Sequence, residues 1–227
     1  MTARRLLLFQ AAADLFTKYG YRKTSVEDIT KAAGVSKGSL YLEFRSKEEL
    51  FEALVRHEFG AYLEDAGERI TADPEGGRLS RIYRHCIEAL LHRAFLRALY
   101  TRDERILAGI LRQRGPQRYR SKVLLGAQFI DRMQQAGLIQ PDIAPETLSH
   151  TLSVLMVGPL LAEPVLHDDD SPALADTFAA LSAMIVTAFE SADGDLGQGK
   201  QAFANLKRDL DRTPTAPAPR AGVTRQQ

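Results

Sequence analysis

The segment that organises the chain is residues 20–50, which read GYRKTSVEDITKAAGVSKGSLYLEFRSKEEL. Ser25 stands where a helix N-cap is expected, and Asp28 follows three residues later, close to a capping-box pattern. Gly34 fits the left-handed position after a helix, and Ser36 is placed to cap the next one. The segment therefore predicts two short helices joined by a tight turn, which is the spacing of a helix-turn-helix unit.

Longer helices are expected on both sides of this unit. Apolar residues recur at helical spacing before it, and Gly20 ends their run; they are Leu8, Ala12, Leu15, Phe16 and Tyr19. After it, Ser46 and Glu49 have the full capping-box pattern and predict the start of a long helix that reaches about Ile70. The first 50 residues are thus predicted to form a small all-helical unit continued by a linking helix.

The second short helix has side chains suited to a DNA groove. Its outward positions are expected to be Ser36, Lys37, Gly38, Ser39 and Tyr41. Hydroxyls and lysine can contact bases and phosphates, and glycine allows a close approach of the backbone. Residues 1–50 hold nine Lys or Arg and six Asp or Glu, a net charge of +3, whereas the remainder has a net charge of −2. This distribution permits binding to nucleic acid but does not require it.

The composition excludes several classes of protein. The 227 residues are 44% hydrophobic and 26% charged, which is typical of a folded domain and not of a disordered chain. A single cysteine, Cys86, cannot form an internal disulfide, and we expect a reducing, cytoplasmic location. No apolar run approaches the roughly 20 residues of a membrane helix, and the apolar stretch at 6–9 is shorter than that of a secretory signal.

The rest of the chain is also predicted to be helical. Loops are expected at 73–77, 140–142 and 167–172, where Gly, Pro and Asp are frequent. Helices are predicted at about 79–101, 103–114, 117–135, 145–164 and 172–191. Residues 193–227 are polar and rich in Gly, Pro, Ala and Thr, so a largely disordered tail is expected, with a short amphipathic helix at about 200–211 as an option.

The first 50 residues closely resemble the TetR family of bacterial transcription regulators. The resemblance is carried by residues 9–29 (FQAAADLFTKYGYRKTSVEDI), 32–41 (AAGVSKGSLY) and 44–50 (FRSKEEL). It implies an all-α protein with an N-terminal three-helix helix-turn-helix DNA-binding domain at 1–50, whose linking helix spans 47–70. A helical ligand-binding and dimerisation domain would follow at 51–192, and the polar tail would occupy 193–227.

The resemblance also implies which residues contact DNA. They are Thr24, Ser25, Ser36, Lys37, Gly38, Ser39, Tyr41 and Lys47, with Lys47 and Ser25 on phosphates. The alternatives are a purely capping role for the serines, a surface role for the two lysines and a rim position for Tyr41. Thr30 and Glu43 depart from the common family pattern, and a carboxylate at Glu43 leaves the sequence preference open.

Two further surfaces are implied in the larger domain. The helices at 145–164 and 172–191 are expected to form a two-fold dimer interface, closely packed through small residues such as Ala173, Ala175, Ala179, Ala180 and Ala183. The alternative is that they pack within one subunit. Candidates for an effector pocket are apolar or aromatic, which favours an apolar effector. They are Tyr62, Leu63, Tyr83, Ile87, Leu91, Phe95, Leu107, Leu111, Phe129, Met133 and Met156.

The predicted function is therefore a dimeric, ligand-responsive transcription regulator, most simply a repressor of a palindromic operator with half-sites about 34–36 Å apart. An effector that lowers operator occupancy 10–100-fold must favour the non-binding state by about 1.4–2.7 kcal/mol. The alternative is a helical small-molecule-binding protein without operator binding. An enzyme is not predicted, because no nucleophile, base or nucleotide loop has suitable spacing. His85, Cys86 and His150 lack metal-ligand spacing, so neither a metal nor a cofactor is expected.

Overall fold

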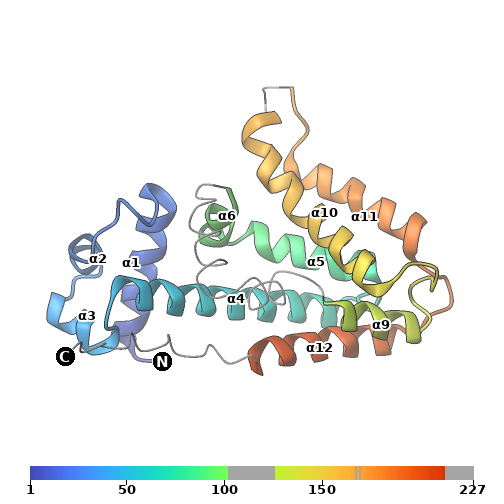
Figure 1. Cartoon of the computed structure of the whole chain (residues 1–227), viewed down its shortest axis with the longest axis horizontal. Coiled ribbons are helices and arrows are strands. Elements are labelled where there is room, and N and C mark those ends of the chain that lie inside the picture. Colours follow the sequence, from blue (N-terminus) through green and yellow to red (C-terminus); the bar gives the residue numbers. More distant parts are fainter. Residues whose placement is uncertain (102–125, 167, 169, 213–227) are drawn as a thin grey trace, which may run out of the picture.

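The computed structural model describes residues 1–101, 126–166, 168 and 170–212, and over these residues the chain is built from helices (Figure 1). An isolated bridge between Ile139 and Glu190 is the extended pairing found there. The helices are α1 Ala3–Tyr19, α2 Val26–Ala32, α3 Lys37–Glu43, α4 Lys47–Ala72, α5 Leu79–Leu91, α6 Ala94–Thr101, α9 Ala127–Gln135, α10 Pro145–Leu166, α11 Leu174–Phe189 and α12 Leu196–Arg212. The predicted all-α class is confirmed.

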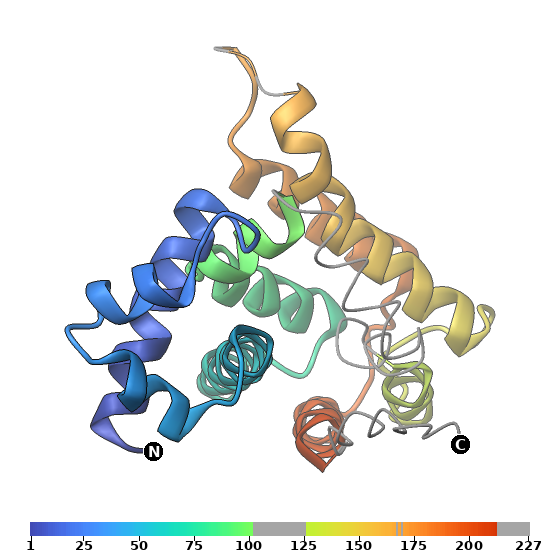
Figure 2. The same cartoon turned by 60° about the vertical axis from the view of Figure 1, so that its left-hand side comes forward.

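The long helix α4 connects two groups of helices. Helices α1, α2 and α3, here called the head, gather around its N-terminal end, and the remaining helices, here called the body, lie along the rest of it (Figure 1). Figure 2 views α4 nearly end-on and shows α12 beside it, α9 beside α12 on the side away from α4, and α10 and α11 as an outer pair. The buried apolar residues of head and body form one continuous core.

The predicted helix at 79–101 is wrong in one respect, because it is broken in two. Helix α5 ends at His92, whose backbone N–H bonds to the carbonyl of Glu88. Its ring nitrogen Nδ1 lies 2.6 Å from the same carbonyl oxygen, and the next backbone N–H, that of Arg93, bonds to the carbonyl of Leu90 three residues back, so the α-helical pattern ends here. The chain resumes as α6, which turns its apolar face towards α1 and α10. The helix predicted at 103–114 and the first part of the one predicted at 117–135 lie outside the described residues.

The prediction of a largely disordered tail at 193–227 does not hold for residues 196–212, which form α12. Its buried residues, Ala202, Phe203, Leu206 and Leu210, follow helical spacing and pack against α4 and α9. An ion pair joins Lys207 to Glu64 of α4. The optional helix at 200–211 is therefore real and longer than expected, and its narrow apolar stripe was hidden by a polar average composition.

A cluster of charged side chains fixes the junction between α4 and α5. Asp73 follows the last turn of α4, and its carboxylate accepts hydrogen bonds from Arg81 Nε at 2.6 Å and from the His85 ring at 2.8 Å. Its side chain is only 8% exposed. The bond from Arg81, followed by that from His85, holds the pKa of the Asp73 carboxyl well below its ordinary value.

We expect Asp73→Asn to lower the free energy of unfolding by about 2 kcal/mol at pH 7, the scale of hydrogen bonds to a charged group. Because the pKa of Asp73 is depressed in the folded protein, this stabilisation is present above the pKa of an unfolded aspartate, near 4, and is lost as the pH falls below it. Urea unfolding from pH 7 to pH 3 measures the difference between variant and wild type, which should shrink in acid. Glu75→Gln serves as the control. It removes the ion pair of Glu75 with Arg78 near the surface and should change the free energy of unfolding little. A pH-independent difference would contradict the assignment.

Two properties of the body bear on the sequence analysis. Cys86 is buried, as expected of a small apolar side chain, and burial raises the pKa of its thiol to about 12. Among the described helices, none combines the length and the hydropathy that crossing a membrane requires.

Candidate nucleic-acid interface

Local hydrogen bonds define α2 and α3 as predicted. Ser25 Oγ accepts from the backbone N–H of Asp28 at 3.1 Å, and the Asp28 carboxylate accepts from the N–H of Ser25 at 2.9 Å, a complete capping box. Gly34 has φ +64° in the turn, a conformation that L side chains rarely adopt. Ser36 Oγ then accepts from the N–H of Ser39 at 3.1 Å and starts α3. The predicted caps and turn are confirmed.

Helix α3 is anchored from one side by two core residues. Leu40 and Phe44 are 0% and 1% exposed. The ring of Phe44 lies 5.7 Å from that of Phe9 on α1, and the guanidinium of Arg5 lies 4.7 Å from the Phe44 ring centre. These contacts fix both the depth and the rotation of α3, so its opposite face has a defined orientation.

The opposite face of α3 is open to solvent. Lys37, Gly38, Tyr41 and Leu42 are exposed, and Arg45 continues the same side just beyond the helix. Lys37, Gly38 and Tyr41 were expected here from the sequence. Leu42 was not, although its position two residues from both Leu40 and Phe44 is the signal that places it opposite the core.

Two of the predicted hydroxyl contacts are engaged inside the head. The side chain of Thr24 is buried, and its hydroxyl donates to the carbonyl of Gly20 at 2.9 Å, so it holds the turn before α2 and does not face outward. Ser39 is half-buried, with its Oγ 2.9 Å from Ser36 Oγ. Ser25 and Ser36 are exposed and remain accessible from solvent.

Lys47 also has partners inside the head. Its Nζ donates to the carbonyl oxygens of Tyr21 at 3.0 Å and Thr24 at 2.9 Å, and it lies 4.2 Å from the centre of the Tyr21 ring. These contacts join the first turn of α4 to the α1–α2 turn. The ammonium of Lys47 therefore stabilises the packing of the head. The spacing of residues in the sequence does not predict this role.

The two departures from the family pattern have structural explanations. Thr30 is buried, and its hydroxyl donates to the carbonyl of Glu27 at 3.1 Å, so the polar group is satisfied within α2. Glu43 is turned towards the start of α1, where it accepts a hydrogen bond from Thr2 at 3.0 Å and lies 4.0 Å from Arg5. Its negative charge is thereby partly balanced within the head.

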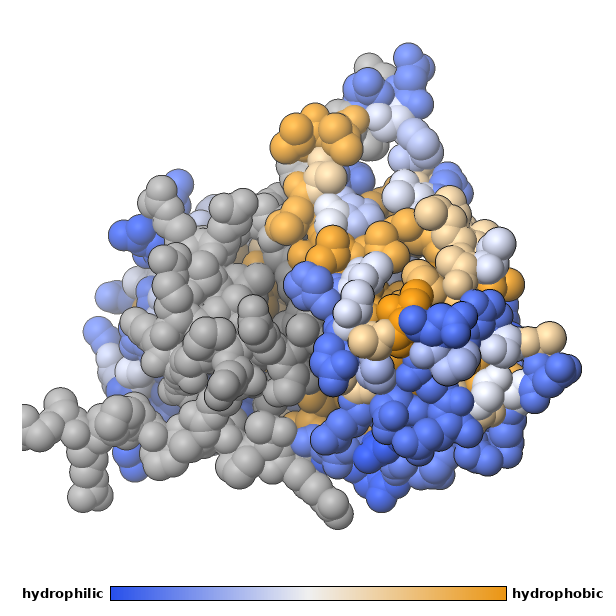
Figure 3. All heavy atoms as spheres, turned by 45° about the vertical axis from the view of Figure 1, so that its right-hand side comes forward, coloured by the Kyte–Doolittle hydropathy of each residue, from blue (hydrophilic) through white to orange (hydrophobic). Residues whose placement is uncertain are grey.

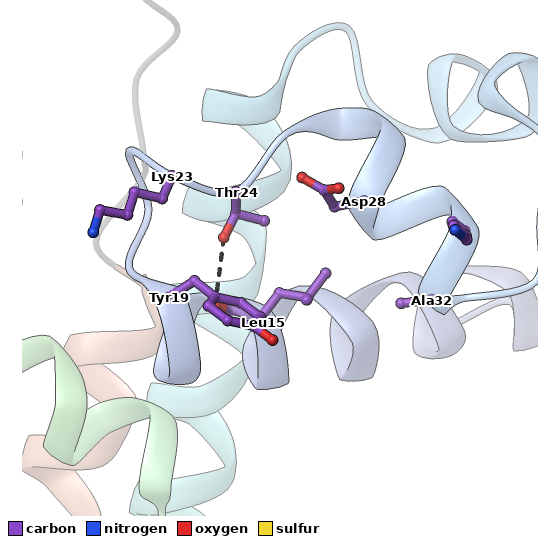
Figure 4. Close-up of a pocket in the computed structure, with 7 residues that line it drawn as sticks. Leu15, Tyr19, Lys23, Thr24, Asp28 and Ala32 are labelled. Atoms are coloured by element: carbon purple, nitrogen blue, oxygen red, sulfur yellow. Dashed lines mark hydrogen bonds between the residues drawn. The ribbon is translucent and has the colours of Figure 1, made fainter.

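A shallow groove of about 630 Å³ runs between α1 and α2 (Figure 4). Tyr19 and Lys23 lie at one end, Lys31 lies on α2, and the dashed line in Figure 4 joins the Thr24 hydroxyl to the Leu15 carbonyl. Lys23 and Lys31 are exposed. The hydroxyl and backbone N–H of Ser25 lower the pKa of the Asp28 carboxyl. The two lysines extend the positive surface of the head beyond α3.

The proposed effector residues belong mainly to the core of the body. Tyr62, Leu63, Tyr83, Ile87, Phe95, Phe129, Met133 and Met156 are buried, and Leu91 is half-buried. The Tyr83 hydroxyl donates to the carbonyl of Leu155 at 2.9 Å. Phe129 borders a groove of about 300 Å³ between α9 and α12. Leu107 and Leu111 lie outside the described residues.

A buried anchor on one face of α3 and an exposed basic face opposite it are the geometry of a helix-turn-helix DNA-binding domain. Comparison with known proteins identifies this domain further. The family model of bacterial regulatory proteins, tetR family, matches residues 8–54. Over these residues the chain is thus similar to the TetR family of bacterial regulatory proteins.

Individual relatives extend the similarity beyond the head. The chain is 33% identical over 110 residues to the HTH-type transcriptional repressor KstR2 of Mycolicibacterium smegmatis, covering 48% of this chain and 53% of KstR2. It is 29% identical over 163 residues to the repressor DhaR of Mycobacterium sp., covering 70% and 82%. Across YhgD of Bacillus subtilis and four KstR2 proteins, the chain spans between 27% and 53% of the relative's length.

The fold is also found in a solved structure. The fatty acid degradation regulator FadR of Bacillus halodurans superposes with a TM-score of 0.63 at 17% identity, covering 83% of this chain and 97% of that one. At this identity the likeness concerns the fold, which includes the body as well as the head.

Proposed function

We propose that the protein is a homodimeric transcriptional repressor that places α3 of each subunit in the major groove of a palindromic operator and is released by a small apolar effector. The observation that carries this proposal is the exposed face of α3, held rigid by Leu40 and Phe44. Lys37, Tyr41, Ser25 and Ser36 would contact phosphates or bases, and Gly38 would permit a close approach. The relatives KstR2 and DhaR are named as repressors, which supports repression of transcription over activation.

The partner for dimerisation would be a second copy of the outer pair α10 and α11. Large apolar side chains are exposed on it, including Leu161, Val165, Met184 and Val186. Figure 3 shows apolar residues gathered over this side of the body, above a strongly polar lower part. The small residues Ala179, Ala180 and Ala183 are exposed on α11, which supports close packing of two such pairs.

Release by an effector would act through α6. This helix packs against α1 in the head and α10 in the body. The ring of Phe95 on α6 lies 6.4 Å from that of Phe16 on α1 and 6.0 Å from that of Phe51 on α4. An apolar effector that displaces α6 would therefore move the head relative to the body.

A gel-shift titration with the DNA upstream of the protein's own gene tests this function. The dimer should retard the fragment, its affinity should fall steeply between 50 and 200 mM salt, and excess unrelated duplex should not abolish binding. Binding of apolar ligands without any salt-dependent DNA binding would favour the alternative, a helical small-molecule-binding protein.

The same titration separates the roles of the two lysines. Lys37→Met should make the plot of log affinity against log salt less steep. The negative slope should become smaller in magnitude by about 1.8 for a dimer that loses one phosphate contact in each subunit. Lys47→Met should leave the slope unchanged and lower the free energy of unfolding by about 2 kcal/mol, because its ammonium bonds to the carbonyls of Tyr21 and Thr24. If the salt dependence becomes equally less steep in both variants, Lys47 contacts a phosphate of the DNA as Lys37 does.

A further inference from the structure

The most exposed large apolar side chain of α3 is Leu42, at 80%. Leu40 and Phe44, two residues before and after it, are buried, so the rotation of the helix points Leu42 directly away from the core. Because α3 is fixed by those two anchors, Leu42 occupies a defined place on the surface and is not part of a loose chain end.

The surroundings of Leu42 are polar and positively charged. Lys37 and Tyr41 on α3 and Arg45 just beyond it are exposed, as Leu42 is. The neighbouring carboxylate of Glu43 is held by Thr2 and Arg5, at the start of α1. A polyanion such as DNA is the partner that this charge pattern complements.

Leu42 is also uncovered along the helix. The position four residues before Leu42, on the same side of the helix, is Gly38. Gly38 has no side chain, and the nearest atom to a Cβ built there is Ser36 Oγ at 3.8 Å. Both residues are exposed, so a partner's surface can reach the Leu42 side chain and the backbone at Gly38.

The chemistry of a leucine restricts what it can recognise in a DNA groove. Its side chain neither donates nor accepts hydrogen bonds, so it gains nothing from the polar edges of guanine, cytosine or adenine. The apolar group that the major groove offers is the C5 methyl of thymine. We propose that Leu42 reads the methyl group of one thymine in each operator half-site and is a specificity-determining residue of α3. This inference rests on the proposed function.

Deoxyuridine, which is thymidine without the methyl group, tests the contact. Wild-type protein first selects its preferred sequences from a pool of random 30-bp duplexes at low salt. Each thymine of the selected duplex is then replaced by uracil, in matching positions of both half-sites, and the affinity is measured. One such replacement should weaken wild-type binding about fourfold per half-site and about 15-fold for the pair, from the transfer free energy of one methyl group.

Leu42→Ala should abolish this difference, so that the thymine and uracil duplexes bind equally. Leu42→Met keeps an apolar side chain and should retain part of the discrimination. Leu7→Ala, which truncates another exposed leucine of the head, should behave like the wild type. Circular dichroism verifies that each variant is folded.

The outcomes are distinct. Equal loss on uracil duplexes in wild type and Leu42→Ala, or no loss at any thymine, would overturn the reading by Leu42 while leaving operator binding intact. Failure of the wild type to select any sequence from the pool would overturn the proposed function itself, and the inference with it.

Discussion

Leu161→Glu combined with Met184→Glu is expected to yield a folded monomer that binds its operator at least about 100-fold more weakly than the wild type. Both side chains are exposed apolar groups of the outer pair α10 and α11, at 44% and 62%, and neither belongs to the buried core of the subunit. A two-fold interface would bury each position twice and place the new carboxylates in an apolar contact. Loss of the partner then removes the gain from binding two half-sites at once, which ranges from about 100-fold to 10,000-fold.

Light scattering after size-exclusion chromatography measures the mass, and a gel shift measures the affinity. Ala204→Glu introduces a carboxylate at an exposed position of α12, away from the outer pair, and should leave both unchanged. If the double variant remains a dimer, α10 and α11 are not the interface. If it is a monomer with undiminished affinity, operator binding does not need two subunits.

Phe44→Ala is expected to lower the free energy of unfolding by about 3–5 kcal/mol, the cost of removing a buried phenyl group. Phe44 is 1% exposed, contacts Phe9 and lies under the guanidinium of Arg5. Its loss should also weaken operator binding strongly in the folded fraction, because one of the two anchors of α3 is gone. Urea unfolding followed by circular dichroism, with a gel shift at low temperature, measures both effects.

Phe44→Leu is the matched control, since it keeps an apolar side chain at the same position and should cost less than about 1.5 kcal/mol. A comparable loss of stability in both variants would mean that the aromatic contacts, and not the filled volume, hold α3. An alanine variant of normal stability would show that α3 does not depend on this anchor.

The sequence predicted the head well because its signals are local. Ser25, Asp28, Gly34 and Ser36 act on backbone groups within four residues of themselves, so their spacing alone fixes the caps and the turn. The rotation of α3 also follows from residue spacing, since Leu40 and Phe44 lie four residues apart on one face. What remained undetermined were the contacts between segments that are distant in the sequence.

Lys47 illustrates that limit. A lysine at the start of a helix is equally suited to a phosphate and to a carbonyl, and only the folded positions of Tyr21 and Thr24 decide between them. Helix α12 is another example, because its narrow apolar stripe is stable only where α4 and α9 cover it. At the break between α5 and α6 the N–H of Arg93 bonds to the carbonyl of Leu90, a local turn that helical propensity does not predict.

The length of α4 has a mechanical consequence. Helix α4 has 26 residues without interruption and measures roughly 39 Å along its axis. Because the head lies at one end, a change in the tilt of α4 moves the head by a distance that grows with this length. A tilt of about 5° at the far end carries the head roughly 3 Å, about the rise of one base pair. In the proposed dimer, the two-fold axis would repeat this displacement in the second subunit, and the two α3 helices would be out of step with the grooves by about two base pairs in total.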